Sequence, residues 1–243
     1  MKIFKTFESF LQEGVNDPGI LKAFFMAGGP GSGKSYVAGE LFGLPKDSSA
    51  SVSYDLGLKL VNSDAAFELL LKKANIDMAQ LMDIKDKDPA AWQDAMQIRA
   101  KAKKITKGTQ KMYILGRLGM VIDGTGKNYK KIEGQVKELR ELGYDCYMVF
   151  VNTSKEVALE RNNNRPRKLP EDMVAKMWQE VQDNLGRFQR LFKAKRFEIV
   201  DNSKYGDSEP TDLVGKEIRK FMGQPVSNPI GKQWIQDQKN SRK

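Results

Sequence analysis

Five short apolar runs are spaced along the chain after residue 20, each bounded by polar or turn-forming residues. Apolar side chains at successive positions predict strands that are buried on both faces, as in a parallel sheet. The predicted strands span residues 23–27, 58–62, 119–123, 145–151 and 197–200.

Amphipathic stretches separate these runs and predict helices, because their apolar residues recur at helical spacing. The predicted helices span residues 34–42, 64–74, 89–115, 128–142, 154–163, 171–192 and 211–222. The alternation predicts an α/β fold in three layers, with a mainly parallel five-stranded sheet and helices on both faces. We expect one domain over residues 21–222, an amphipathic segment at 1–20 and a flexible basic tail at 223–243.

Residues 28–35 fit the phosphate-binding loop pattern G-x-x-x-x-G-K-[ST] between a predicted strand and a predicted helix. This context predicts a P-loop NTPase fold, with backbone N–H groups converging on a phosphate at a helix N-terminus. Lys34 would reach the β- and γ-phosphates of ATP, and Ser35 would ligate Mg²⁺. The predicted nucleotide-binding residues are Gly28, Gly29, Pro30, Gly31, Ser32, Gly33, Lys34, Ser35 and Tyr36.

Two aspartates follow predicted strands and are therefore expected at the same edge of the sheet as the loop. Asp64 is the candidate general base that accepts the proton of an attacking hydroxyl, or an N-cap of the next helix, or both. Asp123 is the candidate second ligand of Mg²⁺, and the alternative is a turn aspartate before Gly124.

A basic, proline-broken segment at residues 160–170 predicts a mobile lid. Arg161 and Arg165, four residues apart, are the stronger candidates to stabilise charge on a transferring phosphoryl group, and Arg167 is a further one. The alternative is a solvated basic loop.

The overall composition limits which catalytic groups, metal sites and partners the chain can use. Lys and Arg number 41 against 31 Asp and Glu, so the chain is basic and compatible with an acidic substrate. The absence of histidine makes a carboxylate the natural base and excludes His/Cys zinc sites. The lone Cys146 excludes an intramolecular disulfide and suits a cytoplasmic protein. No apolar run approaches the roughly 20 residues that span a bilayer, so no membrane partner is expected.

A basic stripe lies on the long helix predicted at 89–115, formed by Arg99, Lys103, Lys107 and Lys111. It is either a solvated helix face or a track for a nucleic-acid backbone along residues 99–111. The apolar residues that recur on the same helix and are expected to face the core are Ile98, Ala102, Ile105 and Met112.

Together these motifs resemble the P-loop kinases of the zeta-toxin and polynucleotide-kinase type, over residues 22–203. The matching segments are AGGPGSGKS, VNSDAAFE, VIDGTGKN, ERNNNRPRKLP and EIVDNS. The resemblance implies that Asp64 activates the acceptor hydroxyl, that Lys34 and the lid arginines Arg161 and Arg165 bind ATP phosphates, and that Asn202 lies near the adenine. The family often has an arginine three residues after the catalytic aspartate, where this chain has Phe67.

Residues 1–14 resemble the capsid-targeting peptides of tailed bacteriophages, whose protease cleaves after L-x-E; here Leu11-Gln12-Glu13 precedes Gly14. The resemblance implies association with a phage head, packaging in the virion, and the host cytoplasm as the place of action. The alternative is a short helix that packs Phe4, Phe7 and Leu11 on the domain.

The sequence therefore predicts an ATP-dependent kinase with Mg²⁺. Its acceptor would be a hydroxyl or phosphate on a polynucleotide 5′-end or on a nucleotide-like small molecule. Two alternatives stay open, an ATP-dependent nucleic-acid motor or packaging accessory and a virion-associated nucleotide-binding protein without turnover. Gly124, rather than a glutamate, follows Asp123, which disfavours a motor with paired acids at the strand end.

Overall fold

The computed structural model describes residues 14–17, 19–44, 53, 56–165, 168–204 and 209–241. Five parallel strands form one sheet in the order β2-β3-β1-β4-β5. Their bounds are β1 Lys22–Ala27, β2 Lys59–Val61, β3 Met120–Asp123, β4 Asp145–Asn152 and β5 Phe197–Asp201. All five predicted strands and the parallel sheet are confirmed. Of the targeting segment predicted at residues 1–14, residues 1–13 lie outside the described residues.

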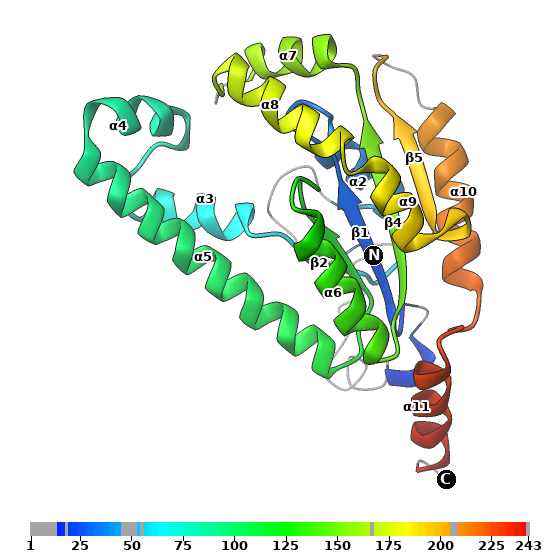
Figure 1. Ribbon diagram of the computed structural model, residues 1–243. Helices are drawn as coiled ribbons and strands as arrows, with labels where there is room; N and C mark the ends of the chain where they lie inside the picture. The colour runs from blue at the N-terminus through cyan, green and yellow to red at the C-terminus, as the bar shows by residue number, and fades with distance from the viewer. Residues whose placement is uncertain are drawn as a thin grey trace, which may run out of the picture.

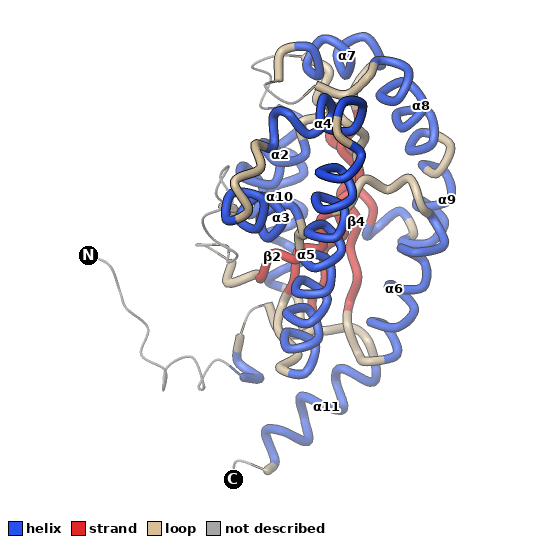
Figure 2. The backbone as a smooth tube through the Cα atoms, turned by 90° about the vertical axis from the view of Figure 1, so that its left-hand side faces the viewer, coloured by secondary structure: helices blue, strands red, loops and turns tan. Residues whose placement is uncertain are grey.

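Helices cover both faces of the sheet, which confirms the predicted three layers. Figure 2 shows α2 and α10 on one side of the strands and α6 and α9 on the other. The helix bounds are α2 Lys34–Phe42, α3 Asp64–Lys73, α4 Leu81–Lys87, α5 Pro89–Leu115, α6 Tyr129–Glu141, α7 Lys155–Asn163, α8 Glu171–Gln182, α9 Leu185–Phe192, α10 Glu209–Gly223 and α11 Pro229–Asn240. Short 3-10 turns lie at Gly14–Asn16, Met78–Gln80 and Ala194–Arg196.

Successive residues of the central strand β1 serve two hydrophobic cores. Phe24 packs with Phe221 of α10, with ring centroids 5.4 Å apart, while Phe25 packs with Phe192 of α9 at 5.6 Å. All six residues of β1 are buried, and the five that follow Lys22 are apolar on both faces of the strand. This double burial is why the strands appear in the sequence as continuous apolar runs.

A third, smaller core lies away from the sheet and joins α3, α4 and α5. Its buried members include Phe67 and Leu71 of α3, Leu81 of α4, and Ala95 and Ala102 of α5. Figure 1 shows the three helices forming an arm beside the sheet, with α4 at its far end.

The arm changes which residues of α5 are buried. The predicted helix at 89–115 is confirmed, and Ala102 is buried as predicted. The prediction for Ile105 and Met112 is wrong, because they are 47% and 66% exposed. The reason is that α5 meets α3 and α4 through its buried alanines and the partly buried Met96 and Ile98, so that Ile105 and Met112 lie outside this contact.

Two further predictions differ from the structure. The helix predicted at 171–192 breaks at Asp183–Asn184 into α8 and α9, because the Asn184 side chain turns inward to hold the loop after β3. Its Nδ2 donates to the carbonyls of Gly126 (3.0 Å) and Lys127 (2.9 Å). The segment predicted as a flexible tail contains helix α11, capped by Asn228 at its first turn.

Asp145, at the start of β4, holds this C-terminal segment to the sheet. Its carboxylate accepts hydrogen bonds from the Ser227 N–H (2.6 Å), the Ser227 hydroxyl (2.9 Å) and the Asn228 N–H (3.1 Å). It also pairs with Arg196 at 3.0 Å, and its side chain is 5% exposed. These partners compensate the burial of the charge.

Across the described residues, no helix combines the length and apolar character that crossing a membrane requires.

The buried charge of Asp145 gives a stability prediction. Asp145→Asn removes the charge opposite Arg196 and directs an amide toward backbone donors, so we expect the free energy of unfolding to fall by about 3 kcal/mol in urea titration. The matched control is Glu141→Gln, which removes the carboxylate of an exposed pair with Lys137 and should change stability by less than about 0.5 kcal/mol. Equal effects of the two substitutions would contradict the assigned role of Asp145.

Candidate active site

The glycine-rich loop connects β1 to α2 at the carboxyl edge of the sheet. Its entrance is fixed by the neighbouring strand β3, because the Gly28 N–H donates to Thr125 O (3.0 Å) and the Gly124 N–H donates to Met26 O (3.2 Å). Gly31 and Gly33 have φ values of 77° and 81°, in the left-handed region that favours glycine. The loop and the end of β3 therefore form one continuous surface.

The loop is packed so closely from two sides that side chains are excluded. A Cβ at Gly31 would overlap the carbonyl oxygen of Ala158 in α7, and a Cβ at Gly33 would overlap the side-chain nitrogen of Asn202. Gly28 is similarly constrained, since its Cβ would lie 2.8 Å from Val151 O. The glycines are thus required by packing as well as by backbone conformation.

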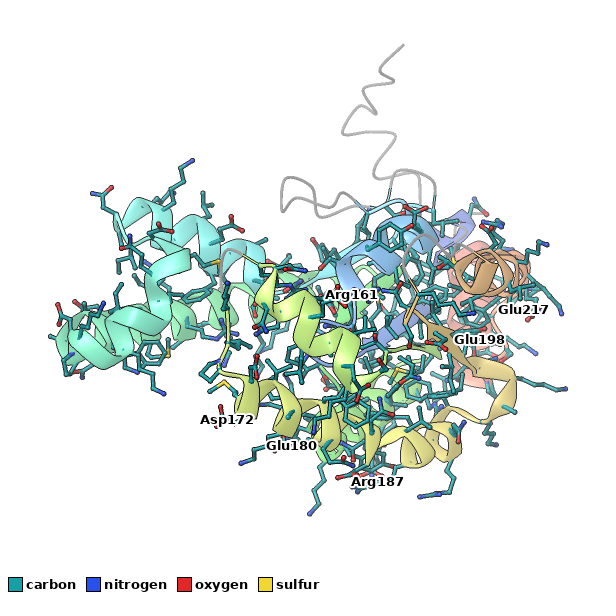
Figure 3. The ribbon with its side chains drawn as sticks, turned by 90° about the horizontal axis from the view of Figure 1, so that it is seen from above. Arg161, Asp172, Glu180, Arg187, Glu198 and Glu217 are labelled. Atoms are coloured by element: carbon teal, nitrogen blue, oxygen red, sulfur yellow. The ribbon has the colours of Figure 1, made fainter. Side chains whose placement is uncertain are left out.

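Two predicted residues contact this loop directly. The Asn202 Nδ2 donates to Ser32 O at 2.8 Å, so the structure places Asn202 against the loop backbone. The Arg161 Nη1 lies 3.5 Å from Gly31 O, and Figure 3 shows Arg161 on α7 beside the start of α2. Arg165 is exposed, and no contact within the described residues joins its side chain to the loop. Arg167 lies outside the described residues.

Asp123 ends β3 one strand away from the loop. Its Oδ2 accepts a hydrogen bond from Asn62 Nδ2 at 2.9 Å, whereas Oδ1 is buried and has no hydrogen-bond partner within the described chain. Burial raises the pKa of Asp123, the nearby Lys34 ammonium lowers it, and the nearby Asp64 carboxylate raises it. Lys34, Asp64 and Asp123 are therefore close enough to interact electrostatically, as the strand-end pattern predicted.

The Asp123 Oδ1, which has no hydrogen-bond partner among the described residues, indicates whether this site suits a magnesium ion. A buried carboxylate oxygen without a donor is costly unless a cation or donor approaches it, and Mg²⁺ prefers oxygen ligands. Ser35, in the first turn of α2, adds a hydroxyl near the same loop and is exposed. These residues fit Mg²⁺, with Asp123 and Ser35 as the residues that would hold it.

Asp64 begins α3 at the neighbouring strand end. The alternative role as an N-cap is not observed, because Ser63 occupies that position and the Asp64 N–H instead donates to Asn62 Oδ1 at 2.8 Å. The Asp64 side chain is 66% exposed and lies 3.7 Å from the Arg99 guanidinium of α5. Arg99 in turn stacks over the Phe67 ring, with its Cζ 4.8 Å from the ring centroid.

Phe67 stands where the kinases that the sequence resembles often have an arginine, yet Asp64 has a basic neighbour in the structure. An arginine reaches Asp64 from α5 rather than from its own helix, and Phe67 supports it. Asn62 is a second residue that sequence reasoning missed. Its two side-chain atoms join the Asp123 carboxylate to the N-terminus of α3, and its position directly before Ser63 and Asp64 at the strand end was the available signal.

The segment that the sequence predicted as a lid is held by the buried amide of Asn162 and lies beside Trp178 of α8. Asn162 clasps the lid segment, because its Nδ2 donates to Leu169 O (2.8 Å) and its Oδ1 accepts from the Leu169 N–H (3.0 Å). Trp178 of α8 donates through Nε1 to Thr153 O at 2.9 Å. The Trp178 backbone also lies over the loop, 3.5 Å from where a Cβ on Gly29 would sit. Helices α7 and α8 therefore cover the loop that joins β1 to α2 (Figure 1).

Comparison with known proteins agrees with this architecture. The family AAA_33, described as an AAA domain, matches residues 24–188. No curated protein is significantly similar in sequence. A solved structure from the PezAT chromosomal toxin–antitoxin system of Streptococcus pneumoniae is similar, with a TM-score of 0.51 and 15% identity over 91% of this chain and 86% of that chain.

A second similar structure is AvrRxo1-ORF1:AvrRxo1-ORF2 with sulphate ions, at a TM-score of 0.56 and 14% identity. The match covers 81% of this chain and spans 60% of that chain. At these identities the likeness concerns the fold, which is that of P-loop NTPases.

The raised pKa of Asp123 predicts a pH-dependent cost to stability. Because the folded protein holds this proton more tightly than the unfolded chain, the ionised carboxylate destabilises the fold above the folded-state pKa. We expect Asp123→Asn to melt a few degrees higher than wild type at pH 7 without Mg²⁺. The difference should shrink as the pH falls through the raised pKa toward the ordinary value of 3.8.

The control for this experiment is Asp94→Asn, at an exposed position of α5, which should leave the melting temperature unchanged. Addition of ATP and Mg²⁺ should stabilise wild type more than Asp123→Asn, because binding to the folded state raises its stability. A variant that melts below wild type at pH 7 without Mg²⁺ would contradict the assigned cost of the buried charge.

Proposed function

Because the chain belongs to the AAA_33 family of AAA domains, with a P-loop and acidic strand ends, we propose that it is an ATP-dependent kinase. It would transfer the γ-phosphoryl group of ATP to a hydroxyl or phosphate of a nucleic-acid 5′-end or a nucleotide-like molecule. The observation that carries the proposal is that Asn62 joins Asp123 to the first turn of α3, which holds Asp64, at the sheet edge that carries the P-loop.

The donor half of the site consists of the loop, α7 and the end of β3. Backbone N–H groups of residues 28–35 and the Lys34 ammonium would bind the ATP phosphates. Mg²⁺ held by Ser35 and Asp123 would neutralise charge on the β- and γ-phosphates. Arg161, beside Gly31, is placed to add a planar cation on the lid side.

The acceptor half is built around Asp64. Its exposed carboxylate would accept the proton of the acceptor hydroxyl while the hydroxyl oxygen bonds to the γ-phosphorus and the bond to the ADP oxygen breaks. ADP leaves with the electron pair of that bond. Asp64 lies in the first turn of α3, and the Arg99 guanidinium 3.7 Å away would orient its carboxylate from the side.

Substitutions in the two halves should separate ATP binding from transfer. We expect Lys34→Ala and Asp64→Asn both to reduce transfer from γ-labelled ATP by about 100-fold or more. The Asp64→Asn variant should still bind ATP, since Asp64 belongs to the acceptor half. The acceptors in the screen are DNA and RNA 5′-ends, nucleoside monophosphates and nucleotide sugars.

Asp94→Asn is the matched control, because it removes an exposed carboxylate of α5 outside the site and should leave transfer unchanged. Undiminished transfer by Asp64→Asn would exclude Asp64 as the base. Hydrolysis of ATP without transfer to any acceptor in the screen would count against a kinase.

A further inference from the structure

A groove begins at the candidate site and runs between α5 and α6. It has a volume of about 660 Å³, and its lining includes Ser63 and Asp123 at the site end. Its floor is made by buried residues of the strands, including Phe25 and Ile122. Figure 1 shows α5 and α6 running past the same part of the sheet, and the lining continues away from the site to Ile114 of α5 and Leu139 of α6.

Lysines dominate both walls. The α5 wall contributes Lys103, Lys107 and Lys111. The other wall contributes Lys127, just before α6, and Lys131, in the first turn of α6. All five are exposed. None forms an ion pair with another described residue, so within that part of the chain their charges are not neutralised by neighbouring carboxylates. Asp123 and Glu138 are the acidic residues of the lining.

The charges are arranged along a line. The three α5 lysines are four residues apart, which places them about 6 Å apart and spreads them over about 12 Å of the helix axis. A line of cations complements a chain of phosphates better than a single phosphate group does. The second wall, from Lys127 and Lys131, distinguishes this groove from a basic helix face that is merely solvated.

The remaining lining narrows the class of ligand. Phe25 is 1% exposed, so the aromatic residue of the lining offers no surface on which a base would stack. A volume of about 660 Å³ lies in the range of small-molecule pockets, so the enclosed part of the groove would take only the terminal nucleotides of a single strand and no duplex. Recognition would therefore use the phosphates of a single strand, independent of base sequence.

We infer that this groove binds the backbone of single-stranded nucleic acid, with the 5′-terminal nucleotide at the Asp64 end. The inference rests on the proposed kinase function for the identity of the reacting end, and it names the acceptor class of that site. The binding itself requires no ATP and no transfer.

The test is fluorescence anisotropy of a 3′-labelled 12-mer of deoxythymidylate with a 5′-hydroxyl, titrated with the full chain at several salt concentrations without ATP. If all five lysines contact phosphates, the slope of log Kobs against log salt should be about −3.5 for a single strand. The variant Lys103→Gln/Lys107→Gln/Lys111→Gln should flatten that slope by about 2 and weaken binding at least tenfold at low salt.

The matched control is Lys101→Gln/Lys104→Gln/Lys130→Gln, which removes the same charge from exposed positions of α5 and α6 outside the groove lining. It should keep most of the slope and the affinity. Equal weakening by both triple variants, or no salt-dependent binding by wild type, would overturn the inference. So would tight binding of a nucleotide diphosphate that the groove lysines support while the 12-mer fails to bind.

Failure of the proposed function is distinguishable from failure of this inference. Lys34→Ala should lose transfer and keep binding of the 12-mer, since Lys34 belongs to the donor half. Groove-dependent binding without transfer would retain the groove and reject the kinase. Transfer to a small acceptor that the groove variant leaves unchanged would retain the kinase and reject the groove as its acceptor site.

Discussion

The close packing around the glycine-rich loop is the constraint on which the site depends. The Ala158 carbonyl and the Asn202 side chain occupy the positions that side chains on Gly31 and Gly33 would take. The loop is therefore held between α7 and the segment that follows β5. Protein contacts alone, without a bound nucleotide, hold its backbone in this conformation. This arrangement links three parts of the chain that are distant in sequence, and it fixes the start of α2, where Lys34 lies.

Much of the fold was predictable because its strands are buried on both faces and its helices carry local boundary signals. Asp88 and Pro89 mark the start of α5 in the sequence, and Asn128 caps α6. The break at Asn184 was not predictable, because the asparagine leaves the helix for hydrogen bonds to a loop almost 60 residues away. Helix α11 carries a local start signal of the same kind, Asn228 before Pro229, whereas its attachment to the sheet depends on Asp145, which is distant in sequence.

The candidate site shows the same division between local and distant information. Strand ends and the loop pattern located Lys34, Asp64 and Asp123, because all parallel strands end at one edge. The pairing of Arg99 with Asp64 could not be predicted, since it requires the crossing of α3 and α5. The same crossing places Arg99 over the Phe67 ring. Phe67, which stands where the resembling kinases often have an arginine, thus supports an arginine from another helix.

The two halves of the site belong to different hydrophobic cores, and this has a mechanical consequence. Helix α5 is about 40 Å long. Near its C-terminal end, Tyr113 and Ile114 pack on the core of the sheet that contains Phe25. A rotation of about 10° about that end would carry Arg99 through about 4 Å. The hydrogen bonds of Asn62 tie the first turn of α3 to Asp123, so Asp64 would stay at the sheet edge while Arg99 moved. The helix is thus a lever through which the outer end of the arm would set the distance between Arg99 and Asp64.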